Sequence, residues 1–229
     1  ETRDTDTGNH IRRTQYYVRA LAQSLADHPR FKAFLTPHNI DLLFKTAPLH
    51  DIGKVGIPDR ILLKPGRLTP EEFEIMKTHC VLGRDAIAHA EERLGVEVDF
   101  LHMAKEIAHS HHERWDGTGY PQGLSGDNIP VAARIMAVAD VYDAITSQRI
   151  YKDPIPHDLA VREIENGKAS QFDPDIVQAF LSIEEAIEQI GLSFADTASD
   201  IAQKMAHIGT AVLASRQDTA KAEPETRLR

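Results

Sequence analysis

The chain has 229 residues, of which 41% are hydrophobic and 27% are charged, a balance typical of one globular domain with a sizeable core. Its formal net charge of −9 argues against broad electrostatic binding to nucleic acid polymers, although a small anionic substrate stays compatible with it. No apolar run approaches the ~20 residues of a membrane span, so membrane insertion is not expected.

Helical periodicity begins near the N-terminal end. The apolar side chains of residues 9–26 fall mostly at helical spacing, and residues 40–47 form a shorter helical stretch that ends at Pro48. The strongest helix start is Thr69-Pro-Glu-Glu72, because it combines an N-cap threonine, a proline at the first helical position and a capping-box glutamate. This segment is predicted to continue as one helix up to Gly95.

The second half of the chain follows the same pattern. Residues 99–112 are predicted to be helical, and a loop dense in glycine and proline follows at residues 115–126. Another helix starts near Pro130, and weaker helical patterns cover residues 159–166, 174–190 and 195–214. No segment shows sustained period-2 alternation, so the predicted fold is all-α.

These helices are expected to form one domain over residues 1–214. The polar residues 215–229 are predicted to be a disordered tail. Because the chain starts with a polar run at Glu1 rather than with methionine, we expect a regulatory module to precede it in a longer protein.

Histidines and aspartates cluster in a pattern that packing alone does not require. The pattern comprises His50-Asp51, His79, His111-His-Glu113 and Asp140, and such groups need polar partners once they are buried. A shared metal site would provide those partners. Imidazole with carboxylate suits divalent iron, manganese, nickel or zinc, and the carboxylate of Asp51 could bridge two ions about 3.5–4 Å apart, as in two-metal phosphoester hydrolases.

The chain has one cysteine, Cys80. A single cysteine excludes an internal disulfide framework and a thiolate-rich metal site, and it favours the cytoplasm as the compartment. Cys80 itself is expected to be a small buried apolar side chain.

Longer motifs give this cluster a family resemblance. The motifs are His50-Asp-Ile-Gly-Lys54, His111-His-Glu-Arg-Trp-Asp-Gly-Thr-Gly-Tyr-Pro121, Ala139-Asp-Val-Tyr-Asp-Ala144, Asp6-Thr-Gly-Asn-His10, Gly123-Leu-Ser-Gly-Asp-Asn-Ile-Pro130, Arg149-Ile-Tyr-Lys152 and Phe172-Asp-Pro174. Over about residues 5–180 the chain closely resembles the HD-GYP family of cyclic di-GMP phosphodiesterases. The resemblance implies a helical bundle of the HD-domain phosphohydrolase type with a metal cluster in its core, preceded by a sensory or receiver module.

The resemblance also implies a set of metal ligands. The matching residues are His10, His50, Asp51, His79, His111, His112 and Asp140, with Asp51 as the bridging carboxylate. Family members with three ions carry a glutamate at the position of Asp6, and aspartate is one methylene shorter. We therefore expect two divalent transition-metal ions, iron or manganese first and nickel or zinc as alternatives, and treat Asp6 as a doubtful ligand of a third ion.

Substrate contacts follow from the same resemblance. Lys54, Arg149 and Lys152 match positions that meet the substrate phosphates, and Tyr120 matches the tyrosine of the glycine-rich loop. Tyr120 could stack on a guanine or could pin the loop by packing. The residues Glu113 and Asp116 could orient histidine ligands or cap the loop.

The implied reaction is hydrolysis of cyclic di-GMP to linear pGpG and onward to GMP, within bacterial two-component signalling that involves protein partners. Our hypothesis for the mechanism is attack on phosphorus by a hydroxide held between the two ions, bridged by Asp51. Lys54 would donate a proton to the leaving oxygen, and it would add positive charge together with Arg149 and Lys152.

Two alternatives stay open. The first is a phosphohydrolase that prefers pGpG or another nucleotide as its substrate. The second is a catalytically weak sensor or docking module that binds cyclic di-GMP and passes the signal to partners. Loss of metal ligands would mark such a module, and this chain keeps the full set.

Overall fold

A computed structural model of the chain describes residues 8–64, 66–148, 154–203 and 205–206. Its helices are α1 (Gly8–Ser24), α2 (Pro37–Thr46), α3 (Asp59–Leu62), α4 (Pro70–Lys77), α5 (His79–Leu94), α6 (Asp99–Ser110), α7 (Val131–Thr146), α8 (His157–Asn166), α9 (Pro174–Ser182) and α10 (Glu184–Ser193). Short 3₁₀ helices are η1 (Ala47–Leu49), η2 (Ile52–Gly56) and η3 (Gly126–Asn128). The described residues contain no strand, which confirms the all-α prediction.

Side-chain caps set several helix boundaries as the sequence indicates. Thr69 accepts a hydrogen bond from the Glu72 N–H, and the Glu72 carboxylate accepts one from the Thr69 N–H, so the predicted capping box starts α4. Gly95 ends α5 with φ 68°, a left-handed conformation that favours glycine. Thr36 caps α2, which therefore begins at Pro37, a few residues earlier than predicted.

Two segments predicted as single helices are broken. The helix predicted from Thr69 to Gly95 is two helices, because the Thr78 N–H turns to the carbonyls of Ile75 and Met76 between α4 and α5. The stretch predicted over residues 174–190 divides into α9 and α10 at Ile183, whose φ of −125° leaves the helical region. Of the predicted helix 195–214, residues 198–203 and 205–206 are helical, whereas residues 195–197 are described and are not helical. Residues 204 and 207–214 and the tail 215–229 lie outside the described residues.

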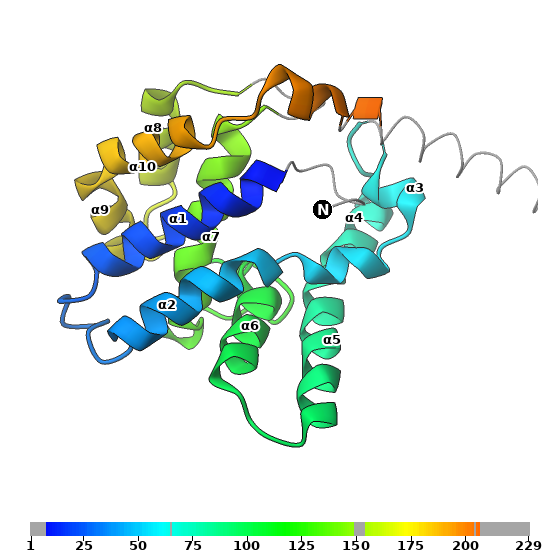
Figure 1. Ribbon diagram of the computed structural model, residues 1–229, viewed down its shortest axis with the longest axis horizontal. Helices are drawn as coiled ribbons and strands as arrows, with labels where there is room; N and C mark the ends of the chain where they lie inside the picture. The colour runs from blue at the N-terminus through cyan, green and yellow to red at the C-terminus, as the bar shows by residue number, and fades with distance from the viewer. Residues whose placement is uncertain (1–7, 65, 149–153, 204, 207–229) are drawn as a thin grey trace, which may run out of the picture.

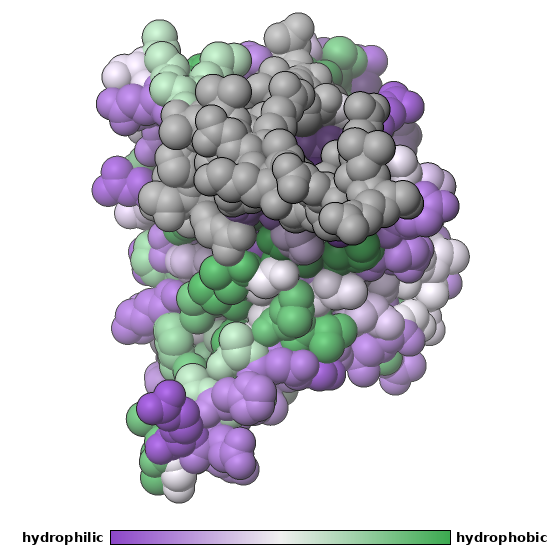
Figure 2. Space-filling model, turned by 90° about the vertical axis from the view of Figure 1, so that its right-hand side faces the viewer, coloured by the Kyte–Doolittle hydropathy of each residue, from purple (hydrophilic) through white to green (hydrophobic). Residues whose placement is uncertain are grey.

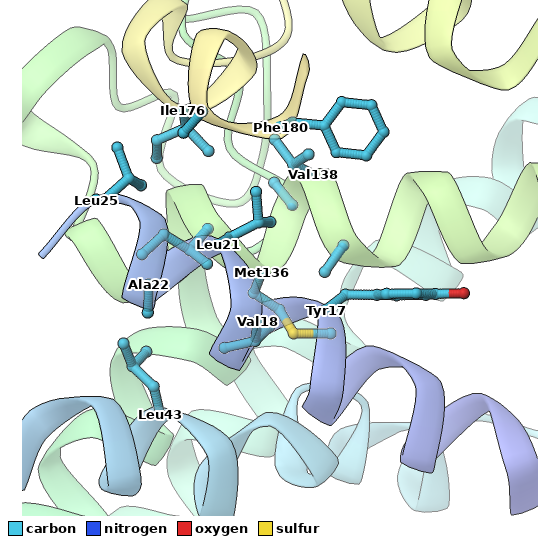
Figure 3. Close-up of a cluster of buried hydrophobic side chains, with 14 of the residues drawn as sticks. Tyr17, Val18, Leu21, Ala22, Leu25, Leu43, Met136, Val138, Ile176 and Phe180 are labelled. Atoms are coloured by element: carbon cyan, nitrogen blue, oxygen red, sulfur yellow. The ribbon is translucent and has the colours of Figure 1, made fainter. Parts of the chain in front are cut away.

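The core is built around α1 and α7 (Figure 3). On α1 the buried side chains recur every three to four residues and form one apolar stripe, which consists of Tyr17, Val18, Leu21, Ala22 and Leu25. Helix α7 is buried on nearly all sides, as its run of alanine, valine, isoleucine and methionine predicts. The core continues through Leu43 of α2 and Phe180 of α9.

Helix α7 has four helical neighbours. It packs against α1, α6, α8 and α9, while α5 packs against α6 and η2 (Figure 1). Because the chain crosses from α2 to α5 through η1 and η2, the residues around His50 lie between these two groups of helices. This junction is where the predicted metal ligands meet.

One face of the molecule carries apolar surface (Figure 2). Exposed large apolar side chains of η2, α4 and α5 are Ile52, Val55, Phe73, Ile75 and Leu82. Among the described residues, no helix combines the length and the apolar character that a membrane crossing demands.

A close backbone approach fixes η2 against α5. A Cβ atom at Gly53 would lie 1.9 Å from the His79 carbonyl oxygen and 2.5 Å from the Gly83 nitrogen. Any side chain at this position must therefore push two backbone segments apart. Both segments carry predicted metal ligands, so this contact also sets the spacing between them.

We expect Gly53→Ala to lower the free energy of unfolding by about 3 kcal/mol or more, because the added methyl group meets backbone that cannot move aside. The matched control is Gly56→Ala in the same 3₁₀ helix, where the new Cβ meets only the Leu82 Cδ1 atom at 2.9 Å. That flexible side chain can shift, so the control should cost about 1 kcal/mol or less. Urea denaturation of both variants measures the difference, and equal losses would contradict the role of Gly53.

Candidate metal centre

The structure brings together all the predicted metal ligands that it describes, and they come from separate elements. His10 lies in the first turn of α1, His50 and Asp51 lie between η1 and η2, His79 starts α5, His111 and His112 follow α6, and Asp140 lies in α7. His50 and Asp51 are turn residues rather than part of a regular helix, since Asp51 has φ −103° and ψ 13°. Tertiary packing, not one local motif, therefore assembles the cluster.

Hydrogen bonds through Nδ1 orient the histidine rings. His50 donates to the Ala47 carbonyl at 2.8 Å, His79 to the Met76 carbonyl at 2.7 Å and His111 to the Ile107 carbonyl at 2.9 Å. The Nδ1 of His10 donates to the Asp143 carboxylate at 2.8 Å. With the proton held on Nδ1, each ring turns its Nε2 atom into the cluster, the arrangement found in histidine ligands of metals.

The donor atoms form two groups. The first, which we call the His79 group, contains His79, Cys80, His111 and His112; the second, the His10 group, contains His10, His50 and Asp140. Within each group the potential ligand atoms lie within 4.8 Å of one another. Each group could therefore hold one ion.

Asp51 lies between the two groups and turns one carboxylate oxygen to each. Its Oδ1 atom is 3.3 Å from the His79 Nε2 atom and 3.7 Å from the His111 Nε2 atom. Its Oδ2 atom is 3.2 Å from the His50 Nε2 atom and 2.7 Å from the Lys54 ammonium. A carboxylate with this orientation could bind two ions at once.

The electrostatics of the cluster follow from burial and from the Asp51 charge. Burial lowers the pKa of His79 to about 4, against the opposing attraction of Asp51, so this ring is neutral at pH 7. Burial also disfavours charge on His50, but the closer Asp51 carboxylate outweighs it and raises the pKa of His50 to about 9. Although burial opposes the ionised form of Asp51, Lys54 and His50 hold the pKa of its carboxyl well below the usual range.

Several buried atoms of the cluster fit a cation. His111 Nε2 and Asp51 Oδ1 have no hydrogen-bond partner, although both side chains are largely shielded from water. His79 Nε2 and Asp51 Oδ1 also face each other at 3.3 Å with a lone pair on each atom. An unsatisfied acceptor costs about 1–3 kcal/mol when buried, and a divalent ion between the acceptors would remove that cost.

The glycine-rich loop folds over the His79 group. Glu113 is buried, and its carboxylate accepts hydrogen bonds from the N–H groups of Gln122 and Leu124 at 2.7 and 3.0 Å. Asp116 accepts two bonds from Thr118 within the same loop. The sequence left open whether these acids orient histidine ligands or hold the loop. Among the described residues both acids bond within the loop, and neither is found bonded to a histidine.

Tyr120 lies against the cluster. Its ring centroid is 4.9 Å from that of His112 at an interplanar angle of 33°. Two residues of α4 that sequence reasoning missed lie beside it: the Phe73 ring is 6.1 Å away, and the Lys77 ammonium lies 5.7 Å from the Tyr120 ring. The sequence gives no signal for these neighbours, because helix α4 precedes the loop by some forty residues and only the fold brings them together.

Three of the predicted site residues lie outside the described residues: Asp6, Arg149 and Lys152. Lys54 is described, and its side chain is 19% exposed at the edge of the cluster beside Asp51. Its contact with the Asp51 carboxylate agrees with the predicted location near the metal ligands.

Sequence reasoning also missed Asp143, which holds His10 in place. Its carboxylate is buried and accepts hydrogen bonds from His10, from Arg13 at 2.6 and 3.0 Å, and from Ser147 at 3.2 Å. Although burial would raise the pKa of Asp143, these donors lower it, so the group is ionised. The signal was present in Asp140-Val-Tyr-Asp143, where two acids one helical turn apart lie on neighbouring faces of α7.

Other residues of the matched motifs are structural. Asp173 caps α9 through the Asp175 N–H and pairs with Arg30 and Arg134, while Asp127 of the glycine-rich loop pairs with the same two arginines. This network anchors the loop to α7 and α9.

Two side chains beside the motifs differ in their relation to the cluster. His109 turns away from the cluster, and its Nε2 atom lies 3.2 Å from the Arg84 guanidinium. Cys80 is fully buried, as expected of a small apolar side chain, and burial raises the pKa of its thiol. Its sulfur nevertheless belongs to the His79 group.

Comparisons with known proteins identify the family of the chain. Residues 6–176 match the family described as HD domain. A probable cyclic di-GMP phosphodiesterase of Vibrio cholerae is 54% identical over 199 residues, and a cyclic di-GMP phosphodiesterase of the same organism is 55% identical over 198 residues. These matches cover 87% and 86% of this chain but only 45% and 40% of the relatives, so the chain spans less than half of their length.

Among solved structures, an HDG"Y"P protein from Bdellovibrio bacteriovorus is similar, with a TM-score of 0.53 and 21% sequence identity. The match covers 75% of this chain and 51% of the other. At this level of identity the likeness concerns the fold, and it agrees with the all-α architecture.

We expect Asp143→Asn to lower the free energy of unfolding by about 3 kcal/mol, because it removes a buried charge from Arg13 and His10. It should also weaken metal binding about 10- to 100-fold, since the His10 ring loses the acceptor that orients it. Urea denaturation of metal-free protein and metal titration measure the two effects.

The matched control is Asp41→Asn, which removes the same charge from an exposed pair with Lys45. Exposed pairs contribute about 0–1 kcal/mol, so neither stability nor metal affinity should change much. If the two variants behaved alike, Asp143 would have no special part in the site.

Proposed function

Because this chain belongs to the HD domain family, we propose that it is a metal-dependent phosphodiesterase that hydrolyses cyclic di-GMP. The resemblance to HD-GYP proteins is confirmed by the family match and by the names of the relatives. The relatives' substrate supports the same substrate here. We also propose a cytoplasmic location. The regulatory module expected before residue 1 stays a prediction.

The observation that carries the proposal is the position of Asp51 between two groups of buried imidazoles. We propose two divalent ions, one in each group, with Asp51 as the ligand that they share. The proposed ligands are His10, His50, Asp51, His79, His111, His112 and Asp140. Iron or manganese is expected first, since imidazole and carboxylate donors suit both ions, and nickel and zinc are alternatives.

Bound ions would neutralise charge on the phosphoryl oxygens and activate water for attack on phosphorus. Lys54 would place its ammonium beside that reaction, because it lies 2.7 Å from Asp51 and its side chain is 19% exposed. From there it could give a proton to the leaving oxygen. Arg149 and Lys152 are proposed to bind the phosphates, as an arginine can do with two parallel hydrogen bonds.

Tyr120 is the proposed contact for a guanine base. One face of its phenol ring packs against the His112 ring. A base that stacks on the opposite face of Tyr120 would therefore lie next to the His79 group. Phe73, which is 45% exposed, extends this aromatic surface, and Lys77 adds a positive charge beside it. The apolar face seen in Figure 2 would then serve a purine dinucleotide.

Turnover of cyclic di-GMP, pGpG, cyclic GMP-AMP and mononucleotides tests the proposal, with metal-free protein reconstituted separately with iron, manganese, nickel and zinc. We expect cyclic di-GMP to be consumed fastest, with pGpG as the first product. Asp51→Asn should lower kcat about a thousandfold, because several kcal/mol of charge stabilisation depend on both ions. The exposed variant Asp41→Asn should keep full turnover.

Two results would contradict the proposal in different ways. Faster turnover of pGpG or of a mononucleotide would favour the nucleotide phosphohydrolase. Binding of cyclic di-GMP by the metal-loaded protein without cleavage would favour the sensor module.

Calorimetric titration of metal-free protein tests the number of ions. We expect two ions per chain, since the described residues form two groups around Asp51. Three ions per chain, reduced to two by Asp6→Ala, would overturn the binuclear proposal.

The same titration gives a pH dependence. In metal-free protein His50 carries a proton on Nε2 below its raised pKa of about 9, and an ion must displace that proton. Metal affinity should therefore rise as the pH increases from 7 towards 9, by about tenfold per pH unit for one displaced proton. Titrations in buffers of different ionisation enthalpy count the protons released, and an affinity that stays constant over this range would contradict the assigned state of His50.

A further inference from the structure

The thiol of Cys80 lies where a metal ligand would lie. Cys80 is fully buried in the first turn of α5, and its sulfur is 3.5 Å from the His79 Nε2 atom. Sulfur and the donor nitrogens of His79, His111 and His112 are all within 4.8 Å of one another. Three imidazoles thus surround the one sulfur atom of cysteine that the chain has.

We propose that Cys80 is a ligand of the ion in the His79 group, so that one position of the metal centre has a sulfur donor and the other has none. This inference rests on the metal centre proposed above. It assigns to Cys80 a part that neither the matched motifs nor the relatives' names provide.

An independent observation points to an ion at the same place. The His111 side chain is completely shielded from water, yet its Nε2 atom has no hydrogen-bond partner. Its Nδ1 atom donates to the Ile107 carbonyl, so the free lone pair on Nε2 points into the group that contains the sulfur. A buried acceptor in this position needs a cation or a donor.

The distances fit a metal polyhedron. Zinc bonds nitrogen at about 2.0–2.1 Å and sulfur at about 2.3 Å, so at the angles of about 90–110° found in four- and five-coordinate sites an edge of about 3.1–3.6 Å joins the two donors. The distance of 3.5 Å between Cys80 Sγ and His79 Nε2 agrees with this edge. The distance of 3.3 Å between His79 Nε2 and Asp51 Oδ1 agrees with the edge of about 3.4 Å expected for nitrogen and oxygen.

The same contact also serves the metal-free protein. There the Cys80 S–H group lies against the His79 Nε2 lone pair, a weak hydrogen bond that satisfies the thiol. An ion that binds both atoms takes the place of the thiol proton, which passes to solvent, and no electron is transferred. The metal-free contact and the metal-bound form therefore use the same two atoms, Cys80 Sγ and His79 Nε2.

A sulfur donor would make the two ion positions chemically unequal. Thiolate favours softer ions such as zinc, whereas the imidazole and carboxylate donors of the His10 group also suit manganese. The centre should then accept two different metals, with the softer one beside Cys80. The sulfur donor would add this preference to the difference that the Asp140 carboxylate already makes between the two groups.

Substitution with cobalt(II) tests the proposal on the whole chain. A thiolate bound to cobalt gives a charge-transfer absorption in the near ultraviolet, and this chain has a single cysteine that can cause it. We expect this absorption in the wild-type protein and its complete loss in Cys80→Ser and Cys80→Ala. The visible bands of the cobalt ion should remain in both variants, since imidazole and carboxylate still bind it.

The possible results separate this proposal from the one on which it rests. Full cobalt binding without the charge-transfer absorption would overturn the role of Cys80 and leave the metal centre intact. Absence of cobalt binding to the wild-type protein would overturn both. If the variants do not fold, X-ray absorption of the wild-type zinc protein decides: a sulfur neighbour at about 2.3 Å supports the proposal, and only nitrogen and oxygen neighbours contradict it.

Discussion

The metal centre depends on the hydrogen bonds that the histidine rings donate through Nδ1. Three of these bonds end on backbone carbonyls three or four residues earlier in the chain, and the fourth ends on Asp143. Because the proton stays on Nδ1, the rings turn their Nε2 atoms towards the two groups on either side of Asp51, which presents one oxygen to each group. Such an arrangement of acceptors is unfavourable without a cation, so local structure and cation binding are linked.

The fold serves this arrangement by bringing distant elements together. Helix α7 supplies Asp140 and Asp143 from a buried position, so the acids are held by the packing of the core. The close contact of Gly53 with the start of α5 sets the spacing between Asp51 and His79. Buried Glu113 holds the loop that carries Tyr120. Each of these contacts depends on tertiary structure, and each positions a group next to the cluster.

Much of this could be predicted from the sequence where a local rule decides the structure. The capping box at Thr69 and the helix end at Gly95 each depend on neighbouring residues. The long motifs around His50, Asp51 and His111 indicate a shared site, although tertiary packing assembles it. The helix breaks at Thr78 and Ile183 could not be predicted, because a single residue that leaves the helical pattern hardly changes its periodicity. The contact between Tyr120 and Phe73 joins residues far apart in sequence, so no spacing rule reveals it.

We propose above that each carboxylate oxygen of Asp51 binds one of two ions. Anomalous X-ray diffraction from crystals of the manganese-loaded protein tests it most directly, because the signal locates each ion independently of the protein atoms. We expect two anomalous peaks about 3.5–4 Å apart, one in the His79 group and one in the His10 group. A different oxygen of Asp51 should contact each peak. A single peak, or two peaks of which only one contacts Asp51, would contradict it.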